Sequence, residues 1–117
     1  MRFLSIWSLS NHFQTKVFPS IKSNKKIKIV SVLTNKKNHN FKKKNSFKDK
    51  KKIIAKNNFS YVYISSVNSI HYNYSKFALE NKINVLCEKP ICLKIDQLYS
   101  LKKIATKNKK FFFEVIQ

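Results

Sequence analysis

The chain has 117 residues, a length that fits one folded domain and leaves no room for a second domain. Hydrophobic residues make up 43% and charged residues 26%. Both fractions are near the globular average, which argues against a wholly disordered chain. The formal net charge of +20 would ordinarily indicate a nucleic-acid or anionic-membrane partner.

The charge has a simpler origin in the composition. Lys, Asn, Ile, Phe, Ser and Tyr are abundant and glycine is absent, although average usage predicts about 8 glycines. This bias is typical of an AT-rich coding sequence. Because no RNA-binding aromatic motif or zinc-finger spacing accompanies it, a basic nucleic-acid-binding protein is kept only as an alternative.

Cysteine usage and hydropathy indicate a cytoplasmic protein without a metal site or a membrane partner. Cys87 and Cys92 are separated by four residues rather than the two of a redox or zinc motif, so we expect reduced structural thiols. The apolar stretch at residues 2–7 is short and lacks a cleavage site, which favours a first strand over a signal peptide. No run approaches the ~20 apolar residues of a membrane-spanning helix.

The first half of the chain predicts a βαβ unit followed by a polar tract. Strands are expected at residues 2–7 and 27–33, with a helix at about 11–23 between them. Residues 35–58 are rich in Lys and Asn, and predict an exposed loop or trimmed sheet edge that carries a short helix near 50–56.

The second half alternates strands and amphipathic helices. Strands are expected at 61–65, 84–87 and 111–116, and helices at about 69–81 and 95–108. The apolar stripes of the two helices are Ile70, Tyr74, Phe77 and Ala78, and then Ile95, Leu98, Leu101, Ile104 and Ala105. This order predicts an α/β fold for residues 1–117: a single Rossmann-like domain with a doubly wound, mainly parallel sheet of about five or six strands.

Polar residues follow three of the expected strands. They are Ser8, Ser10, Asn11 and His12 after the first strand, Ser65, Ser66, Asn68 and His71 after the strand at 61–65, and Glu88, Lys89 and Pro90 after the strand at 84–87. In an open parallel sheet, ligands bind outside the carboxyl ends of the strands. We therefore expect the three groups to gather at one binding edge.

Two of these groups lie in segments with a specific resemblance. The segment VYISSVNSIH at 62–71, followed by ALENKINVLCEKP at 78–90, is similar to the Gfo/Idh/MocA oxidoreductase family. That family usually has V-Y-I-A-T-P-N-x-x-H and then A-L-x-x-G-K-H-V-L-C-E-K-P, and Glu114 falls where it has a later acid. The match is close over residues 60–117 and loose over 2–34. It implies a nicotinamide-dependent oxidoreductase of sugar or polyol type.

The resemblance also implies roles for individual residues. Lys89 matches the family lysine beside the nicotinamide and its ribose, a catalytic position where a cation favours alkoxide character as hydride leaves. Glu88 matches the acid near that ribose, and Pro90 fixes a turn that family members often hold in the cis form. Asn68 and His71 match positions that line the cofactor groove. From the residues alone, Asn68 could instead cap a helix and His71 could be a surface or capping residue.

The phosphate-binding loop departs from the family pattern. Its G-x-G-x-x-G/A positions hold Ser8, Ser10 and Phe13, with no glycine in any register. Ser8 would cost about 1–2 kcal/mol in a left-handed conformation. Ser10 places a side chain where phosphate should lie, although its hydroxyl could partly replace a backbone donor. We expect Phe13 to push the helix away or to rotate outward, and pyrophosphate to bind weakly.

The end of the second strand bears on which cofactor binds. It carries Thr34, Asn35, Lys36 and Lys37, without the carboxylate that grips the ribose of NAD. The predicted cofactor is therefore NADP or NAD, with a lean toward NADP and with Asn35 at the site.

The family's substrate domain is not among these residues. We expect a cofactor-binding half that is impaired alone, with a separate chain as a possible source of that domain. The alternative is a non-catalytic nucleotide-binding or scaffold remnant.

Overall fold

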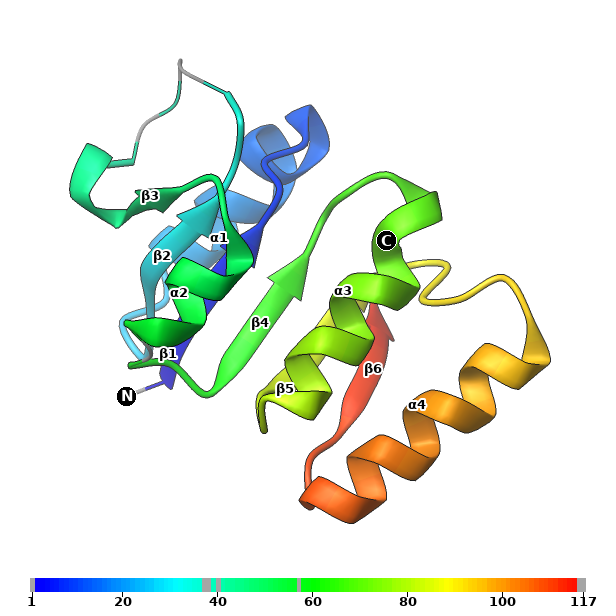
Figure 1. Cartoon of the computed structure of the whole chain (residues 1–117). Helices are drawn as coiled ribbons and strands as arrows, with labels where there is room; N and C mark the ends of the chain where they lie inside the picture. The colour runs from blue at the N-terminus through cyan, green and yellow to red at the C-terminus, as the bar shows by residue number, and fades with distance from the viewer. Residues whose placement is uncertain (1, 37–38, 40, 57, 116–117) are drawn as a thin grey trace.

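Six parallel strands form one sheet in the computed structural model, which describes residues 2–36, 39, 41–56 and 58–115. The strands are β1 (Arg2–Trp7), β2 (Ile27–Leu33), β3 (Ser46–Phe47), β4 (Tyr61–Ile64), β5 (Asn84–Glu88) and β6 (Phe112–Val115). Their order is β3-β2-β1-β4-β5-β6, and every neighbouring pair is parallel (Figure 1). The predicted doubly wound, Rossmann-like fold is confirmed. The strand order reverses between β1 and β4, which makes their carboxyl ends a topological switch point.

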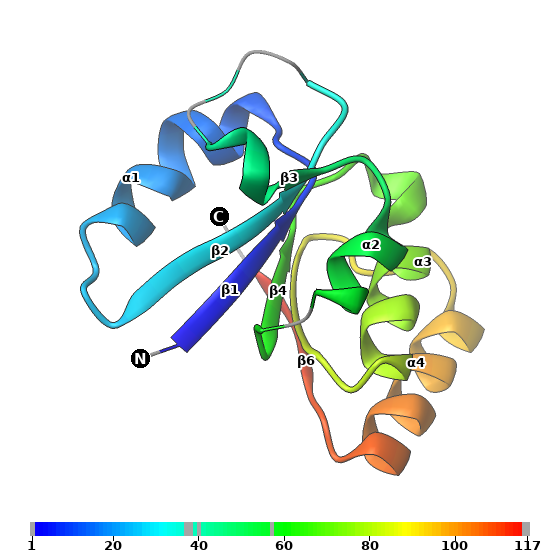
Figure 2. The same ribbon diagram turned by 60° about the vertical axis from the view of Figure 1, so that its left-hand side comes forward.

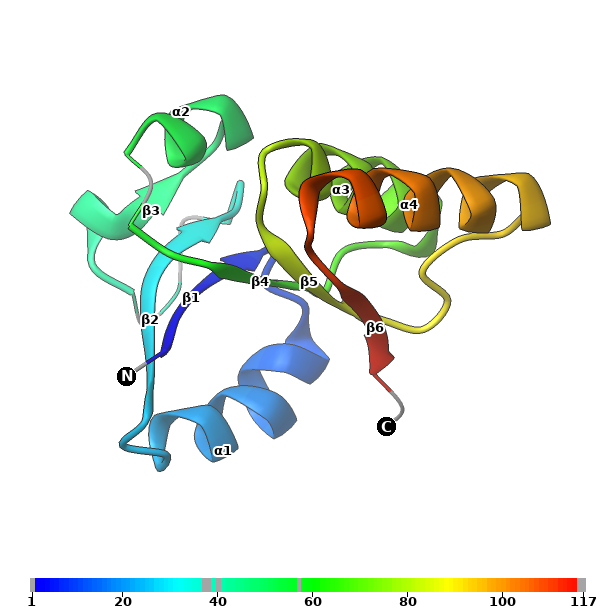
Figure 3. The same cartoon turned by 90° about the horizontal axis from the view of Figure 1, so that it is seen from below.

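Helices cover the sheet on two sides. A π-helical turn η1 (Phe13–Val17) leads into α1 (Phe18–Lys22), and a 3-10 turn η2 (Lys43–Asn45) precedes β3. The longer connections are α2 (Lys50–Ala55), α3 (Asn68–Glu80) and α4 (Ile95–Asn108). Figures 2 and 3 show α1 on one face of the sheet and α2, α3 and α4 on the other. No helix in the described part of the chain is both long and apolar enough to cross a membrane.

The core consists of two apolar clusters, one on each face. One gathers Trp7, Leu79 and Leu101 with their neighbours against α3 and α4, and the other gathers Ile6 and Phe13 on the side of α1. The indole N–H of Trp7 donates to Ser5 Oγ at 3.0 Å, so the buried ring keeps a polar partner. β1 therefore contributes side chains to both layers.

The helix stripes differ from the prediction. The buried residues of α3 are His71, Ser75, Ala78 and Leu79, whereas Ile70, Tyr74 and Phe77 are only half-buried. The stripe is rotated because the ring of His71 turns inward to two backbone carbonyls. In α4, Leu101 and Ala105 are buried as predicted. Ile95 is 61% exposed, since the first turn of α4 lies away from the sheet (Figure 3).

The Lys/Asn-rich tract contributes an element that the sequence did not predict. Its short helix is confirmed as α2, but Ser46 and Phe47 also form the edge strand β3, which pairs with Val32 and Leu33. A two-residue strand is too short for an alternating pattern. Of the other predicted bounds, Ile116 lies outside the described residues, and β6 ends at Val115.

On the side of α1, the sheet is only partly covered. No described helix lies over β5 and β6 on this face (Figure 3). Phe112 packs into the opposite cluster, so alternation along the strand turns Phe113 to the uncovered face, where it is 57% exposed. Leu86 and Val115 border this face and pack against the cluster on the α1 side, but no described helix covers Phe113.

Candidate functional site

The structure brings the three polar strand ends to one edge of the sheet. Trp7 pairs with Ile64, and Ile64 pairs with Cys87, so Ser8, Ser65 and Glu88 follow one another across neighbouring strands. Ser65 Oγ donates to the carbonyl oxygen of Ser8. The Ser8 N–H donates in turn to the carbonyl oxygen of Leu33 at 2.7 Å. Hydrogen bonds thus fasten the turn after β1 to β2 and to the end of β4.

His71 joins the second and third of these turns. Its Nδ1 lies 2.7 Å from the Pro90 carbonyl oxygen and its Nε2 lies 2.8 Å from the Ser66 carbonyl oxygen. Carbonyl oxygens only accept hydrogen bonds, so the imidazolium form donates to both and a neutral ring to only one. The side chain is 1% exposed. A surface or capping role for His71 is therefore wrong, and its ring ties the turn after β4 to the turn after β5.

The Glu88-Lys89-Pro90 turn is held by side chains from three elements. The Tyr63 hydroxyl donates to Glu88 Oε2 at 2.9 Å. Beyond the turn, the Ile91 N–H donates to Glu114 Oε2 at 3.1 Å. The peptide between Lys89 and Pro90 is cis. Lys89 itself is exposed, so a well-anchored turn presents an ammonium group at the sheet edge.

The turn after β1 keeps a backbone shape suited to glycine without having one. Ser8 has φ 72°, in the region where a Cβ costs about 1–2 kcal/mol. Two residues on, Ser10 Oγ accepts from the Phe13 N–H at 3.0 Å and caps the helix start. Asn11 and His12 are exposed in the first turn of that helix. Ser8 therefore adopts the left-handed backbone that glycine favours, and the Phe13 N–H at the helix start is already bonded to Ser10.

Replacing Ser8 with glycine is expected to raise the free energy of unfolding by about 1 kcal/mol, because the Cβ penalty at positive φ disappears. Urea denaturation measures the change. Ser20→Gly is the matched control, since Ser20 lies exposed in α1 and glycine in a helix is expected to lower stability by about 0.5–1 kcal/mol. Equal losses for both variants would contradict a left-handed Ser8.

Of the two outcomes predicted for Phe13, outward rotation is wrong. Its side chain is fully buried, with its ring centroid 5.4 Å from that of Tyr63 and 6.3 Å from that of Phe18. The chain from Phe13 to Val17 forms a π-helical turn, which is wider than an α-helical one. The ring therefore fits between the helix and β4 rather than projecting into solvent.

The remaining predicted residues lie exposed along the same edge. α3 begins at Asn68 with Val67 as its cap residue and no capping side chain, so the capping role for Asn68 is wrong. Asn35 is exposed just past β2. The next residue, Lys36, donates from Nζ to Asn11 Oδ1 at 3.5 Å and so spans from the end of β2 to the helix start. Lys37 lies outside the described residues.

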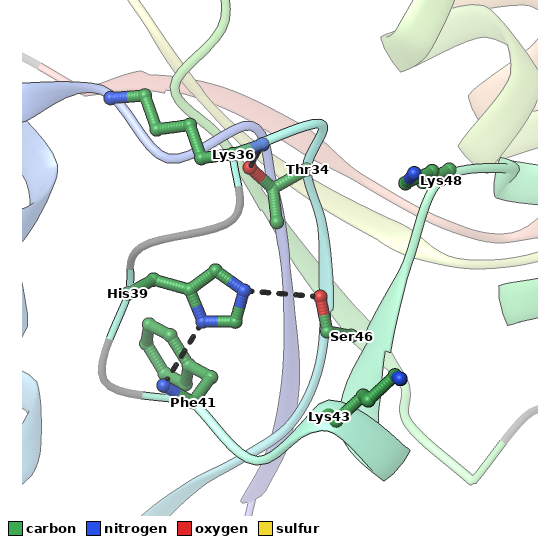
Figure 4. A pocket seen from close by; sticks show the side chains of 7 residues that line it. All are labelled: Thr34, Lys36, His39, Phe41, Lys43, Ser46 and Lys48. Carbon is green, nitrogen blue, oxygen red and sulfur yellow. Dashed lines mark hydrogen bonds between the residues drawn. The ribbon is translucent and has the colours of Figure 1, made fainter.

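A basic pocket, which the sequence did not single out, opens beside the end of β2 (Figure 4). It has a volume of about 430 Å³ and is lined by Thr34, Lys36, His39, Phe41, Lys43, Ser46 and Lys48. The sequence alone does not distinguish Lys43 and Lys48 from the other lysines of the tract. Both residues line the pocket only because of the path that the chain takes into and out of β3. The one available signal was the lack of any acid from Thr34 to Lys48.

The two cysteines are free thiols. Desolvation raises the pKa of the buried Cys87 to about 12, opposed in part by the Ser75 hydroxyl. Burial also raises the pKa of Cys92. Both groups stay protonated at neutral pH, which fits structural thiols rather than nucleophiles. Over the described ranges, no three His, Cys, Asp or Glu side chains gather as a metal site would require.

With this edge defined, comparison with known proteins gives the class. The family GFO_IDH_MocA, described as "Oxidoreductase family, NAD-binding Rossmann fold", matches residues 13–115. The chain belongs to this oxidoreductase family, and its domain is of the kind that binds a nicotinamide cofactor.

Individual relatives agree with that assignment. The chain is 36% identical over 56 residues to an uncharacterized oxidoreductase, YgjR, of Escherichia coli (strain K12), covering 48% of this chain and 17% of the relative. Its fold is similar to that of myo-inositol 2-dehydrogenase from Lactobacillus plantarum, with a TM-score of 0.82, 17% identity, and 97% and 36% of the two chains covered.

A second solved structure is KijD10, a 3-ketoreductase from Actinomadura kijaniata in complex with TDP-benzene and NADP. Its TM-score is 0.86 at 14% identity, with 97% of this chain and 36% of that chain covered. The chain thus spans about a third of the length of these solved proteins.

Proposed function

We propose that this domain is the cofactor-binding half of a sugar or polyol oxidoreductase that uses NADP or NAD, with Lys89 as its catalytic residue. The observation that carries the proposal is the turn at the end of β5. His71 and Tyr63 anchor this turn, and Lys89 is exposed beside the switch point of the sheet. Ligands of open α/β sheets bind at such a point.

The residues along the edge fit an extended dinucleotide. Asn35 would lie at the adenosine end, and Ser8, Ser10, Asn11 and His12 beside the pyrophosphate. The nicotinamide end would face Ser65, Ser66, Asn68, Glu88, Lys89 and Pro90, with His71 behind them. Ser8 has the positive φ that this turn needs, which supports the fit.

Lys89 has a direct chemical role in this arrangement. When bound, the nicotinamide supplies an acceptor or donor of hydride. The Lys89 ammonium would donate a hydrogen bond to the hydroxyl oxygen of the substrate and would stabilise the negative charge left there when the hydroxyl proton passes to a base on the substrate-reading part of the enzyme. Glu88, which accepts from Tyr63, holds the backbone of the turn so that the lysine keeps its place.

Cofactor affinity is expected to be low at the pyrophosphate. Backbone N–H groups at a helix start bind phosphate well when nothing else occupies them. Here the Ser10 hydroxyl accepts from the Phe13 N–H, and Ser8 and Ser10 carry side chains where glycines would let phosphate approach. The loop can hold the cofactor but offers it fewer donors.

The substrate-reading part of the enzyme lies outside these residues in this proposal, on the same chain or on a separate one. The uncovered face of β5 and β6, with Phe113 57% exposed, is the surface it would cover. The names of the inositol dehydrogenase and the ketoreductase support a sugar or polyol substrate. We therefore expect little turnover from these 117 residues alone.

Cofactor titration tests the proposal. We expect saturable binding of NADPH or NADH at one site, followed by the fluorescence of the reduced nicotinamide, and no measurable polyol oxidation by the domain alone. Lys89→Ala is expected to weaken binding at least about tenfold, because one charge-assisted hydrogen bond contributes about 1.5 kcal/mol or more. Lys94→Ala is the matched control, because Lys94 is exposed in the same loop.

Other outcomes would select the alternatives. Equal, small effects of Lys89→Ala and Lys94→Ala would favour a non-catalytic nucleotide-binding remnant. No saturable binding of either cofactor, together with DNA affinity that falls steeply with salt, would favour a nucleic-acid-binding protein.

A further inference from the structure

We propose that the edge of the sheet opposite the cofactor edge is a second binding surface, which takes single-stranded nucleic acid. The strands are parallel, so their starts lie at this edge together with the ends of the helices that lead into them (Figure 1). We call it the amino edge. Its basic residues, at the starts of β2, β1, β5 and β6, are Lys25, Lys26, Arg2, Lys82, Lys109 and Lys110. The proposal does not depend on the proposed cofactor-binding function.

The charges of the chain are divided unequally between the two edges. Four of the five acids lie at the carboxyl ends of strands or at helix starts, namely Asp49, Glu88, Asp96 and Glu114. Glu80, the last residue of α3, is the one acid at the amino edge. Because six basic residues face this single carboxylate, the amino edge carries a positive potential that attracts anionic partners.

The ends of the helices account for only part of this charge. A basic side chain in the last turn of a helix offsets the negative end of the helix dipole, and Lys22 and Lys107 have such positions in α1 and α4. Arg2 and Lys26 do not, because they lie at the start of β1 and just before β2. The Arg2 N–H donates to the carbonyl oxygen of Lys26 at 2.8 Å. The two basic residues are thus held side by side for a reason other than helix capping.

Aromatic rings lie among these cations. Arg2 donates from Nη1 to the Tyr61 hydroxyl at 3.2 Å, and its guanidinium carbon lies 5.7 Å from the centre of the Tyr61 ring. The centre of the Phe111 ring is 5.7 Å from that of Tyr61. Phe3 and Phe111 are each 39% exposed. Since the rings come from β1, β4 and the residue before β6, the fold brings them together and no sequence motif contains them.

The rings border a hollow in the surface. Its volume is about 250 Å³, and its lining residues are Arg2, Phe3, Leu4, Ile27, Tyr61 and Leu86. A flat apolar group can enter this hollow and still lie beside the Arg2 guanidinium. Phe113, which the substrate-reading part would cover, is not among the lining residues.

A single nucleic-acid strand combines the two groups that this surface accepts. Its phosphates are attracted to clustered Lys and Arg, and its unpaired bases stack on aromatic rings. A bilayer instead takes up apolar side chains that project from a surface, whereas these rings border a hollow. We expect little sequence preference, because a mainly apolar lining offers few hydrogen bonds to base edges.

Fluorescence anisotropy of a labelled oligothymidine tests the proposal on the whole chain. We expect saturable binding of a strand of roughly 12 nucleotides, a length in the range that single-strand-binding surfaces cover. A duplex of the same length is expected to bind at least about fivefold more weakly, since it loses the stacking of one base. Saturating NADPH should leave the affinity unchanged, because the cofactor edge lies at the other end of the strands.

A single substitution tests the role of the rings. Phe111→Leu keeps an apolar side chain but removes the aromatic ring, and is expected to weaken single-strand binding at least about fivefold. Tyr99→Leu is the matched control, because Tyr99 is a 62% exposed ring on α4. It should leave the affinity unchanged.

A double substitution tests the role of the cations. Arg2→Gln with Lys26→Gln should reduce the slope of log affinity against log salt by about 1.4, since each phosphate contact on a single strand contributes about 0.7. Lys102→Gln with Lys103→Gln removes the same charge from exposed positions in the middle of α4. This control should leave the slope unchanged.

Three results would overturn the proposal. Equal affinity for single strand and duplex, or wild-type affinity in Phe111→Leu, would show that charge alone attracts the strand. Equal slopes in the two double variants would show that the amino edge does not bind the phosphates. Tighter binding to vesicles that contain phosphatidylserine would assign the surface to a membrane. None of these results bears on the proposed function, which the cofactor titration decides.

Discussion

Replacing Phe13 with alanine is expected to lower the free energy of unfolding by about 3–5 kcal/mol, the range for removing a buried aromatic ring from a core. The ring is fully buried and contacts Tyr63 and Phe18. Alanine would bring the sequence closer to the family pattern at this position, so the motif alone suggests a more stable protein. The packing of Phe13 instead predicts a less stable one.

Urea denaturation of the variant measures this loss, and Phe113→Ala is the control. Phe113 is the same residue type but 57% exposed, so its removal should cost less than about 1 kcal/mol. A Phe13→Ala variant as stable as the wild type would show that the helix moves in to fill the space. In that event, the buried Phe13 ring would not be needed for the packing of this helix on the sheet.

The second large effect is expected at His71. His71→Ala leaves the carbonyl groups of Ser66 and Pro90 without their buried partner. Unsatisfied buried acceptors cost about 1–3 kcal/mol each, so the total loss of stability for the two carbonyl groups should be about 2–6 kcal/mol. Because the ring also anchors the turn that presents Lys89, affinity for the reduced cofactor should fall in parallel.

Two further variants separate the anchoring role of His71 from simple destabilisation. His71→Gln keeps one donating amide and should recover part of the stability and of the cofactor affinity. Asn73→Ala removes an exposed polar group from the same helix and should change neither. If His71→Ala lowers stability but leaves the affinity and the effect of Lys89→Ala intact, His71 does not position the turn.

Much of the fold was predictable because its signals are local. The apolar runs at β1, β2, β4 and β5 and the helical spacing of α3 and α4 gave the strand and helix order, and parallel connectivity followed from the alternation. β3 was not predicted because a strand of two residues is too short to show alternating apolar and polar side chains. The stripe of α3 was misplaced because the burial of His71 depends on the carbonyl groups of two other turns.

Only the motif-bearing part of the candidate site was predicted from the sequence, and the roles of its residues stay predictions. The turn around Lys89 follows from the Glu-Lys-Pro pattern, which the described geometry supports with the contacts of Tyr63 and His71. The basic pocket could not be predicted, since Lys43 and Lys48 meet Thr34 only after the chain returns to the sheet edge through β3. The burial of Phe13 also depends on the π-helical turn at Phe13–Val17, which no pattern in the sequence predicts.

The place of β1 in the sheet has a consequence for how the chain reaches its fold. β1 precedes the other strands of the sheet in the sequence, and its two neighbours are β2 and β4, with the Lys/Asn-rich tract between those two. When two strands far apart in the sequence pair, the chain loses loop-closure entropy before the new contacts form. Sheets built from such pairs therefore fold slowly. Until the sheet is complete, the apolar side chains of β1 and β2 are partly exposed to water. We expect the lysines of the intervening tract to reduce association between unfolded chains by mutual repulsion.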